Sequence, residues 1–392
     1  MPTLDIFDAF DIQQYPEPLY DYGKLYASTP AYPVIFPSGP EAVQEIARLA
    51  YTHDFTLRVR GSGHTFNGAS LPQKDEILIR TDDLDTFCFE TAGTLTAGTG
   101  ALVWDVRDLA RDHGFDLPVY NGGWAGPTLG GYLNAGGFGK SGLSEVYGGL
   151  WEVVEEVRLI DGQGHKHIVN REHPLFPWLF GSYGQLGLIT EVKLKLIPLH
   201  EGKTSTYPLG LSGKIPKRQE ADPKLNDLPP FGKTQTNLFW FSLLVSPLDE
   251  AQAWQDMLGL VKAHPEYLIP DGGWTGPVLN GAPIGYQYVI QFHNFNPPLL
   301  YEKPETFLVM GVMCLLATGD DVSNLRVLQV ERDFIALSQN GNYKLYLQAE
   351  NFGRNIHFQT YYGDKIYGAF RDWKNKLDPK HIINPGIVFL GH

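Results

Sequence analysis

The stretch that decides the fold is RGSGHTFNG, residues 60–68, which directly follows a strand-like segment at residues 57–60. Its glycines have neither the spacing of the dinucleotide GxGxxG motif nor that of a P-loop. Glycines beside small hydroxyl residues let successive backbone N–H groups turn together onto an anion such as a pyrophosphate. An ordinary glycine-rich turn with an exposed histidine at His64 explains the same pattern equally well.

A second glycine-rich stretch changes that balance. It reads GPTLGGYLNAGGFG, at residues 126–139 of what is predicted to be the same α/β module. Two such loops in one module indicate a large flat or elongated ligand that is held by backbone rather than by charged side chains. A dinucleotide fits this description. A nicotinamide-dependent enzyme is disfavoured, because it would need the GxGxxG arrangement that the chain lacks.

The composition limits the classes of partner. The chain has 392 residues and a formal net charge of −13, and no basic run offers a surface for the phosphates of DNA or RNA. Residues 1–15 do not resemble a secretion signal, and no later segment is long and apolar enough to span a membrane. We therefore expect a soluble, cytoplasmic protein with neither a nucleic-acid nor a membrane partner.

The sequence also predicts no metal centre. Its two cysteines, Cys88 and Cys314, are far apart and cannot build a disulfide framework or a cysteine metal site. His165 and His167 form an HxH pair, but no third ligand is nearby, so a solvated turn is favoured over a zinc site.

The order of the elements predicts two structural units. Residues 32–60 read as strand, helix and strand, with the helix beginning at Pro40 and its apolar residues recurring at helical spacing. Residues 201–235 are rich in glycine, proline and charge, which indicates a linker or a long excursion. Beyond them, strand and helix patterns alternate in the manner of an antiparallel sheet covered by helices.

Four motifs in a fixed order resemble a known family. In chain order they are RGSGHTFNG, GGYLNAGGFG, VEEVRLIDGQG with GSYGQLGLITEVKLKLIP, and LDPKHIINPGIVF. Together they resemble the FAD-binding domain of the PCMH type, shared by cytokinin dehydrogenases, berberine-bridge-type enzymes, sugar and lactone oxidases, and vanillyl-alcohol oxidase. The resemblance covers residues 30–200 and 355–390.

The fold that this resemblance implies is of the α+β class. A two-part FAD-binding module holds an inserted substrate domain of antiparallel sheet covered by helices. We expect the FAD-binding domain at residues 1–200, the substrate domain at 201–345, and a C-terminal segment at 346–392 that returns to the FAD-binding domain.

The resemblance also implies FAD as the cofactor. His64 matches the histidine that bonds to the flavin 8α-methyl in covalent members, Ile189 matches a residue whose backbone contacts the adenine side, and Asn384 lies in the stretch that closes over the flavin. The implied cofactor-binding residues are Arg60, Gly61, Ser62, Gly63, His64, Thr65, Asn67, Gly130, Gly131, Asn134, Gly136, Gly137, Ile189 and Asn384.

Two departures from the family pattern concern the linkage and the substrate. Members with double attachment carry a cysteine near the position of Trp124, so the resemblance implies at most one covalent bond, through His64. Cytokinin dehydrogenases carry an aspartate in this region that accepts a substrate proton, whereas residues 120–124 contain no carboxylate. The resemblance therefore leaves the substrate open.

The implied activity is hydride transfer from a CH–OH or CH–NH group of a small molecule to N5 of FAD, with oxygen, a quinone or a protein as the final acceptor. Cytokinin dehydrogenases and sugar or alcohol oxidases are the nearest types. Residues 355–363 would border the flavin as an extended chain, with His357, Gln359 and Tyr361 on one side. The expected catalytic residues are Tyr361, Gln359 and Tyr120. The alternative is a flavin-fold protein that has lost catalysis and binds or senses a ligand.

Overall fold

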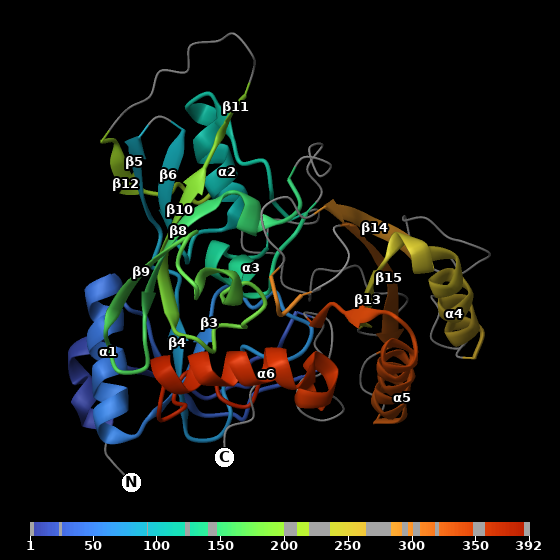
Figure 1. The fold of residues 1–392 in the computed structure, drawn as a ribbon. Coiled ribbons are helices and arrows are strands. Elements are labelled where there is room, and N and C mark those ends of the chain that lie inside the picture. Colours follow the sequence, from blue (N-terminus) through green and yellow to red (C-terminus); the bar gives the residue numbers. More distant parts are fainter. Residues whose placement is uncertain are drawn as a thin grey trace.

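The computed structural model describes residues 4–22, 26–91, 93–121, 126–139, 147–199, 210–218, 236–263, 284–291, 297–300, 306–317, 321–347 and 357–387. Within these ranges the chain builds three sheets of four or more strands and one short two-stranded ladder. Figure 1 shows the first two sheets, in blue to green, on one side of the molecule and the third, in yellow to orange, on the other.

The first sheet carries the loop that opened the sequence. Its strands are β1 (Gln13–Tyr15), β2 (Tyr32–Ile35), β4 (Glu76–Arg80) and β3 (Thr56–Arg60), in that spatial order. The last three are parallel, and β1 is antiparallel to β2. Helix α1 (Pro40–His53) connects β2 to β3 and buries one apolar face, as the helical spacing predicts. The 3₁₀ helix η1 (Leu4–Phe10) packs beside it.

The second sheet is antiparallel and supports the second glycine-rich loop. Its strands, in spatial order, are β12 (Ser212–Lys214), β5 (Thr86–Thr91), β6 (Thr94–Gly98), β10 (Leu188–Lys195), β8 (Val154–Ile160) and β9 (Lys166–Asn170). The shorter elements around it are α2 (Val103–Asp112), α3 (Leu129–Asn134), η2 (Leu150–Glu152), η3 (Phe176–Trp178), and β7 (Phe115–Asp116) paired with β11 (Ile197–Pro198).

One piece of the expected linker is part of this sheet. Strand β12 falls within residues 201–235, yet it pairs antiparallel with β5, and Ser212 lies opposite Cys88. Of the two alternatives, a linker or a long excursion, this piece fits an excursion, because it forms an edge strand that needs only backbone hydrogen bonds and leaves little hydrophobic pattern in a short polar sequence. Most of the remaining expected linker lies outside the described residues.

The third sheet is antiparallel, as expected for the second unit. Its strands, in spatial order, are β14 (Ile284–Gln291), β15 (Thr306–Ala317), β13 (Thr236–Val245) and β16 (Lys344–Leu345). Helices α4 (Glu250–Ala263), which follows the 3₁₀ turn η5 (Pro247–Asp249), and α5 (Asp321–Asn340) contact each other and lie beside the sheet (Figure 1). The domain boundaries at residues 200 and 345 stay predictions.

The C-terminal segment corrects one expectation. Residues 358–363 are not extended, because helix α6 already begins at Phe358 and runs to Leu377, with a break in helical geometry at Gly363 (φ 77°). His357 is its N-cap, and the imidazole Nδ1 accepts a hydrogen bond from the backbone N–H of Thr360 at 3.3 Å. In this helix, Gln359 and Tyr361 do not share one side of a strand.

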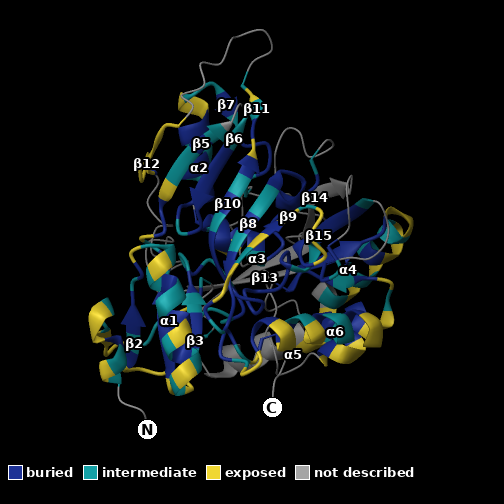
Figure 2. Cartoon of the chain, turned by 60° about the vertical axis from the view of Figure 1, so that its left-hand side comes forward, coloured by how far each residue is buried: buried dark blue, intermediate teal, exposed yellow. Residues whose placement is uncertain are grey.

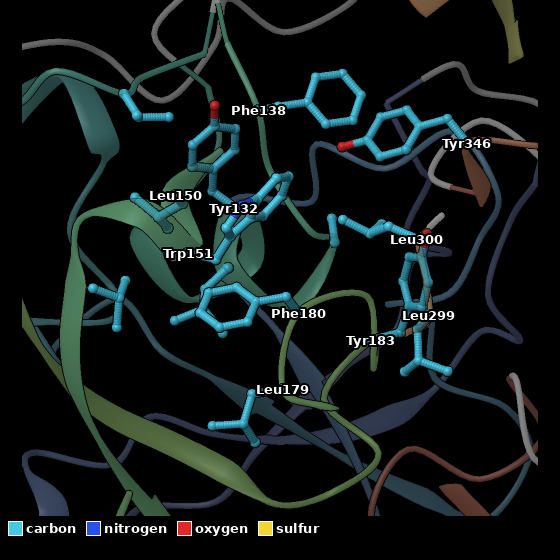
Figure 3. Close-up of a cluster of buried hydrophobic side chains, with 14 of the residues drawn as sticks. Tyr132, Phe138, Leu150, Trp151, Leu179, Phe180, Tyr183, Leu299, Leu300 and Tyr346 are labelled. Carbon is cyan, nitrogen blue, oxygen red and sulfur yellow. The ribbon is translucent and has the colours of Figure 1, made fainter. Parts of the chain in front are cut away.

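The hydrophobic core is continuous between the second sheet and the third. Figure 2 shows buried residues along the central strands, with exposed residues mainly on the outer faces of the helices. Phe138, which follows α3, lies 4.5 Å from the ring of Tyr346 and 5.9 Å from the ring of Phe307, between ring centroids. Figure 3 shows Phe138 and Tyr346 beside each other in this buried cluster. The end of the second glycine-rich loop therefore packs against β15 and against the residue that follows β16.

No helix among the described residues is both long and apolar enough to cross a membrane.

Candidate functional site

The first glycine-rich loop begins at the carboxyl end of β3. Several of its backbone N–H groups have no hydrogen-bond acceptor among the described residues. The N–H groups of Gly61, Ser62, Gly63 and Thr65 donate no hydrogen bond to any residue in the described ranges. The hydroxyl oxygen of Thr65 is buried and also has no hydrogen-bond partner there. Buried polar groups in folded proteins are normally satisfied, and of this set the residue Gly63 and the hydroxyl of Thr65 are buried. The loop therefore has donors that an anionic ligand could accept from.

A buried guanidinium adds positive charge beneath this loop. Gly63 has φ 81°, and a Cβ at this position would overlap the Arg60 guanidinium, so only glycine fits here. Arg60 donates hydrogen bonds to the hydroxyl of Ser70 at 3.0 Å and to the carbonyl of Tyr20 at 2.8 Å. Burial, followed by the nearby charge of Arg80, lowers the pKa of Arg60 to about 10, so the group stays protonated at neutral pH.

The second loop uses its backbone donors within the protein. At the start of α3, the N–H of Leu129 donates to the carbonyl of Ala101 at 2.8 Å, and that of Gly130 to the carbonyl of Thr99 at 2.9 Å. The N–H of Gly131 donates to the N-cap hydroxyl of Thr128 at 3.2 Å. These amides are therefore not available to a pyrophosphate, and the glycines here serve close packing.

The structure brings the two loops into contact. A Cβ on Gly61 would overlap the side chain of Thr128, and the hydroxyl of Ser62 donates to the carbonyl of Gly126. Farther along the second loop, Gly136 has φ 70° and packs against Leu300. A Cβ on Gly137 would overlap the ring of Tyr132. The two remote glycine-rich stretches are therefore in contact, and their joint ligand site stays a prediction.

His64 lies at the seam between the loops. A Cβ on Gly126 would overlap the Cδ2 and Nε2 edge of the imidazole, so the backbone of the second loop touches this ring directly. The ring of Tyr22 stacks on the imidazole at 4.1 Å between centroids, with 30° between the planes. Sequence reasoning missed Tyr22, and no motif marks it, because its contact with His64 arises only from the tertiary fold.

The remaining predicted cofactor residues hold the framework around the loops. Asn67 donates to the carbonyl of Leu347 at 2.8 Å and so connects the first loop to the segment that follows β16. Asn134 donates to the carbonyl of Gly130 at 2.9 Å. The carbonyl of Ile189 accepts a hydrogen bond from the hydroxyl of Thr99 at 2.6 Å. The Asn134 bond lies within α3, whereas Thr99, whose carbonyl accepts from the N–H of Gly130, links the second loop to β10.

Asn384 joins the C-terminal segment to the same framework. Its carboxamide oxygen accepts a hydrogen bond from the N–H of Val59 at 2.8 Å, and its nitrogen donates to the carbonyls of Tyr183 and Gly184. Asn384 has φ 45°, a left-handed conformation that asparagine tolerates better than most residues. It positions β3, from which the first loop starts.

The three expected catalytic residues lie in different surroundings. The hydroxyl of Tyr361 bonds to the backbone of Leu345, accepting from its N–H at 2.7 Å, and Gln359 is exposed and donates to Asp364 at 2.7 Å. Tyr120 follows β7, with the Arg107 guanidinium 3.8 Å from the centroid of its ring. Trp124, which bears on a second attachment, lies outside the described residues.

The histidine pair of the sequence analysis brackets a carboxylate. His165 and His167 both contact one oxygen of buried Asp161, at 3.2 and 2.8 Å. No cluster of three or more histidine, cysteine or acidic residues with a metal-binding arrangement occurs in the part of the chain that the structure describes.

Comparison with known proteins matches residues 31–170 to the family described as FAD binding domain. This part of the chain is therefore similar to an FAD-binding domain. The first glycine-rich loop, whose amides at Gly61, Ser62, Gly63 and Thr65 bond to none of the described residues, lies within the matched residues and touches buried Arg60. The groups present there fit a cofactor with a pyrophosphate, as does the orphaned hydroxyl of Thr65.

Curated relatives with similar sequences include proteins named as FAD-linked oxidoreductases and oxidases, and the match covers only part of their length. An FAD-linked oxidoreductase of Penicillium crustosum is 29% identical over 191 residues, which are 47% of this chain and 41% of that protein. Reticuline oxidase of Eschscholzia californica is 29% identical over 239 residues, 58% of this chain and 41% of that protein. The matches thus span less than half of each relative.

The fold as a whole has a counterpart among solved structures. Cholesterol oxidase from B. sterolicum superposes with a TM-score of 0.67 at 12% sequence identity, over 97% of both chains. This agreement confirms the expected α+β fold, in which the FAD-binding domain is combined with a second unit that contains an antiparallel sheet.

Proposed function

We propose that this protein is a flavin-dependent oxidoreductase that takes a hydride from a CH–OH or CH–NH group of a small molecule. The observation that supports the proposal is the first loop, where backbone amides that bond to none of the described residues lie next to the charge of buried Arg60, within the residues matched to an FAD-binding domain. When bound there, FAD would supply the hydride acceptor, with oxygen, a quinone or a protein as the final acceptor.

The protein's own contribution is to bind and orient. The amides of Gly61, Ser62 and Gly63 would hold the pyrophosphate, and Arg60 would offset its charge from a buried position. Asn67 and Asn384, each bonded to backbone of a remote segment, keep the first loop and the strand before it in place. Rigid support of this kind is what a precisely held cofactor needs.

We further propose a single covalent bond between His64 and the flavin 8α carbon. The contact of the imidazole with Gly126 supports it, because it places this ring where the two loops meet. In the net reaction an imidazole N–H and a methyl C–H bond are replaced by the N–C bond. The two hydrogen atoms are passed to oxygen, giving hydrogen peroxide.

Among the expected catalytic residues we favour Tyr120 as the group that contacts substrate. The Arg107 guanidinium packs on its ring and itself bonds to Asp116, with Nε at 2.7 Å from Oδ1. Tyr361 and Gln359 are weaker candidates, because the hydroxyl of the first is bonded to β16 and the amide of the second to Asp364.

The purified protein tests the cofactor and the linkage in one experiment. We expect a yellow protein whose flavin fluorescence stays with the polypeptide after acid precipitation and denaturing electrophoresis. The His64→Ala variant should bind FAD that is released on denaturation, whereas the exposed control His357→Gln should keep the bound flavin. A colourless wild-type protein that takes up no added FAD would overturn the proposal.

Turnover distinguishes an enzyme from a catalytically silent flavin protein. Anaerobic addition of alcohols, amines and sugars should bleach the flavin with at least one compound, and oxygen or a quinone should restore its absorbance. Loss of bleaching in Tyr120→Phe, with FAD still bound, would support the role of Tyr120. A flavin that no compound reduces, even though light reduces it, would favour a binding or sensing role.

A further inference from the structure

An N-terminal strap covers the first glycine-rich loop. We define this strap as residues 19–22 and 26–28, which fold back on each other in a hairpin-like arrangement. Tyr20 and Ala27 form an antiparallel bridge, and the N–H of Ser28 donates to the carbonyl of Leu19 at 2.7 Å. The strap precedes β2, so it is not part of the motifs that identified the FAD-binding domain.

Backbone hydrogen bonds attach the strap to the loop. The Arg60 guanidinium donates to the carbonyl of Tyr20 at 2.8 Å, and the N–H of Tyr22 donates to the carbonyl of Thr65 at 2.8 Å. A Cβ on Gly68 would come within 3.1 Å of the Tyr26 side chain, so the strap and the loop are in close contact at this point as well. These contacts hold the strap against the loop on both sides of the Tyr22 ring, at Tyr20 and at Tyr26, and so determine where this ring lies.

That ring packs on the face of the His64 imidazole. The ring centroids are 4.1 Å apart, and the edge of Phe66 meets the Tyr22 ring at 5.1 Å with 77° between the planes. On its Cδ2 and Nε2 edge the imidazole meets the backbone of Gly126. The imidazole is thus held between an aromatic face supplied by the strap and the backbone of the second loop.

We propose that Tyr22 is a positioning residue for His64, and that the strap sets the imidazole conformation in which the histidine bonds to the flavin. This inference rests on the proposed covalent linkage. An unrestrained histidine has three staggered wells at χ1 and two broad ones at χ2, which bounds the conformations that loss of the stacked ring can open to His64 beside its other contacts. Only one of these conformations directs the ring as observed, so removing the Tyr22 ring should slow attachment roughly three- to sixfold.

The first test needs no cofactor. We would prepare apoprotein with isotope-labelled histidine and assign the His64 imidazole signals by their loss in His64→Gln. The wild-type carbon-bound protons should carry the upfield ring-current shift of a stacked tyrosine. Tyr22→Phe should keep that shift, because the ring remains, and Tyr22→Leu should lose it. Unchanged His64 signals in Tyr22→Leu would overturn the positioning role.

A matched control separates the ring from the strap. Tyr20 lies in the same strap, but it is 47% exposed. Arg60 donates to its backbone carbonyl and not to its side chain. Tyr20→Leu should therefore leave the His64 signals unchanged. If Tyr20→Leu moves them as far as Tyr22→Leu does, the strap as a whole, and not the Tyr22 ring, positions His64, and the assignment to Tyr22 is wrong.

The second test follows attachment itself. Apoprotein is mixed with FAD in air, and the covalent fraction is read over time from flavin fluorescence in denaturing gels. Tyr22→Leu should attach flavin roughly three- to sixfold more slowly than wild type, at an equal level of bound FAD, while Tyr22→Phe and Tyr20→Leu match wild type. Equal rates in Tyr22→Leu and wild type would overturn the role in attachment. A wild-type protein that binds FAD but never attaches it refutes the covalent linkage, while the imidazole signals still decide whether Tyr22 positions His64.

Discussion

The carboxamide of Asn384 donates a hydrogen bond to the carbonyl of Gly184 at 3.1 Å, across 200 positions of sequence. A second bond from the same nitrogen reaches the carbonyl of Tyr183 at 3.2 Å, and the oxygen accepts from the N–H of Val59. Gly184 has φ 70°, and a Cβ there would lie 2.7 Å from the Asn384 nitrogen, so this approach requires glycine. One buried side chain thus joins the C-terminal segment, the turn before β10 and strand β3.

Replacing Asn384 with glycine should destabilise the fold without straining the backbone. Glycine accepts the left-handed conformation of this position but leaves buried backbone groups of Val59 and Gly184 without their partner. We expect the free energy of unfolding to fall by roughly 1–3 kcal/mol, measured by urea denaturation. An unchanged urea midpoint would show that water replaces the amide at no cost.

A buried lysine near the end of α6 gives a second prediction. The Lys374 ammonium is fully buried and donates to Asp378 at 2.6 Å and to the carbonyls of Gln185 and Ile383 at 2.7 and 2.8 Å. Burial lowers the pKa of Lys374 from its ordinary value, while the charge of Asp378 opposes that shift. The pair tethers α6 to the turn before β10 and to the segment next to β3.

Lys374→Met should leave the Asp378 carboxylate buried without its counter-charge. We expect this variant to lose about 3–5 kcal/mol of unfolding free energy. The control Lys365→Met, at an exposed position of the same helix, should change it by less than about 0.5 kcal/mol. Similar denaturation curves for the two variants would contradict a stabilising role of the buried pair.

Gly126→Ala tests the contact between the second loop and His64. The added methyl group would overlap the imidazole edge, so the ring must move away from the seam. We expect covalent flavin in denaturing gels to fall at least about tenfold, because even small misplacement of reacting groups is costly. Gly368→Ala is the matched control, since a Cβ there meets nothing within 4 Å and helix α6 should gain about 0.5–1 kcal/mol. Full covalent attachment in Gly126→Ala would exclude a role for this contact.

The pH dependence of stability should contain a contribution from His381. Burial, and after it the charge of Lys374, lowers the pKa of this imidazole from its ordinary value of 6.5. Below pH 6.5 the unfolded chain therefore binds a proton at this site more readily than the folded protein does. The stability contribution is fully present above pH 6.5 and is lost as the pH falls toward the lowered pKa of the folded state.

His381→Asn should remove that contribution. Asparagine tolerates the left-handed backbone at this position, where φ is 52°. Urea denaturation from above pH 6.5 to about one unit below it should show that wild type loses stability more steeply than the variant. Parallel losses in the two proteins would mean that other groups carry the acid sensitivity.

The sequence alone predicted an element correctly where apolar residues recur at helical spacing over several turns. Helix α1 buries Val43, Ile46, Ala47 and Ala50, one face of the helix that was expected to begin at Pro40. The start of α6 was misread, because His357, Gln359 and Tyr361 alternate with other residues over too short a stretch to separate a strand from a helix. The buried residues Phe358, Tyr361, Tyr362 and Ile366 show helical spacing only over a longer window.

By itself the sequence determined the similarity of residues 31–170 to an FAD-binding domain, because the glycines, His64 and the motif order are local features of the chain. Only the tertiary structure decided which of the two glycine-rich loops uses its backbone amides for hydrogen bonds within the protein. It bonds the amides of the second loop to Thr99 and Ala101, leaves those of Gly61 and Gly63 unused by the described residues, and stacks Tyr22 on His64. Hydrogen-bond partners and ring contacts between remote segments exist only after the chain has folded, so no local pattern encodes them.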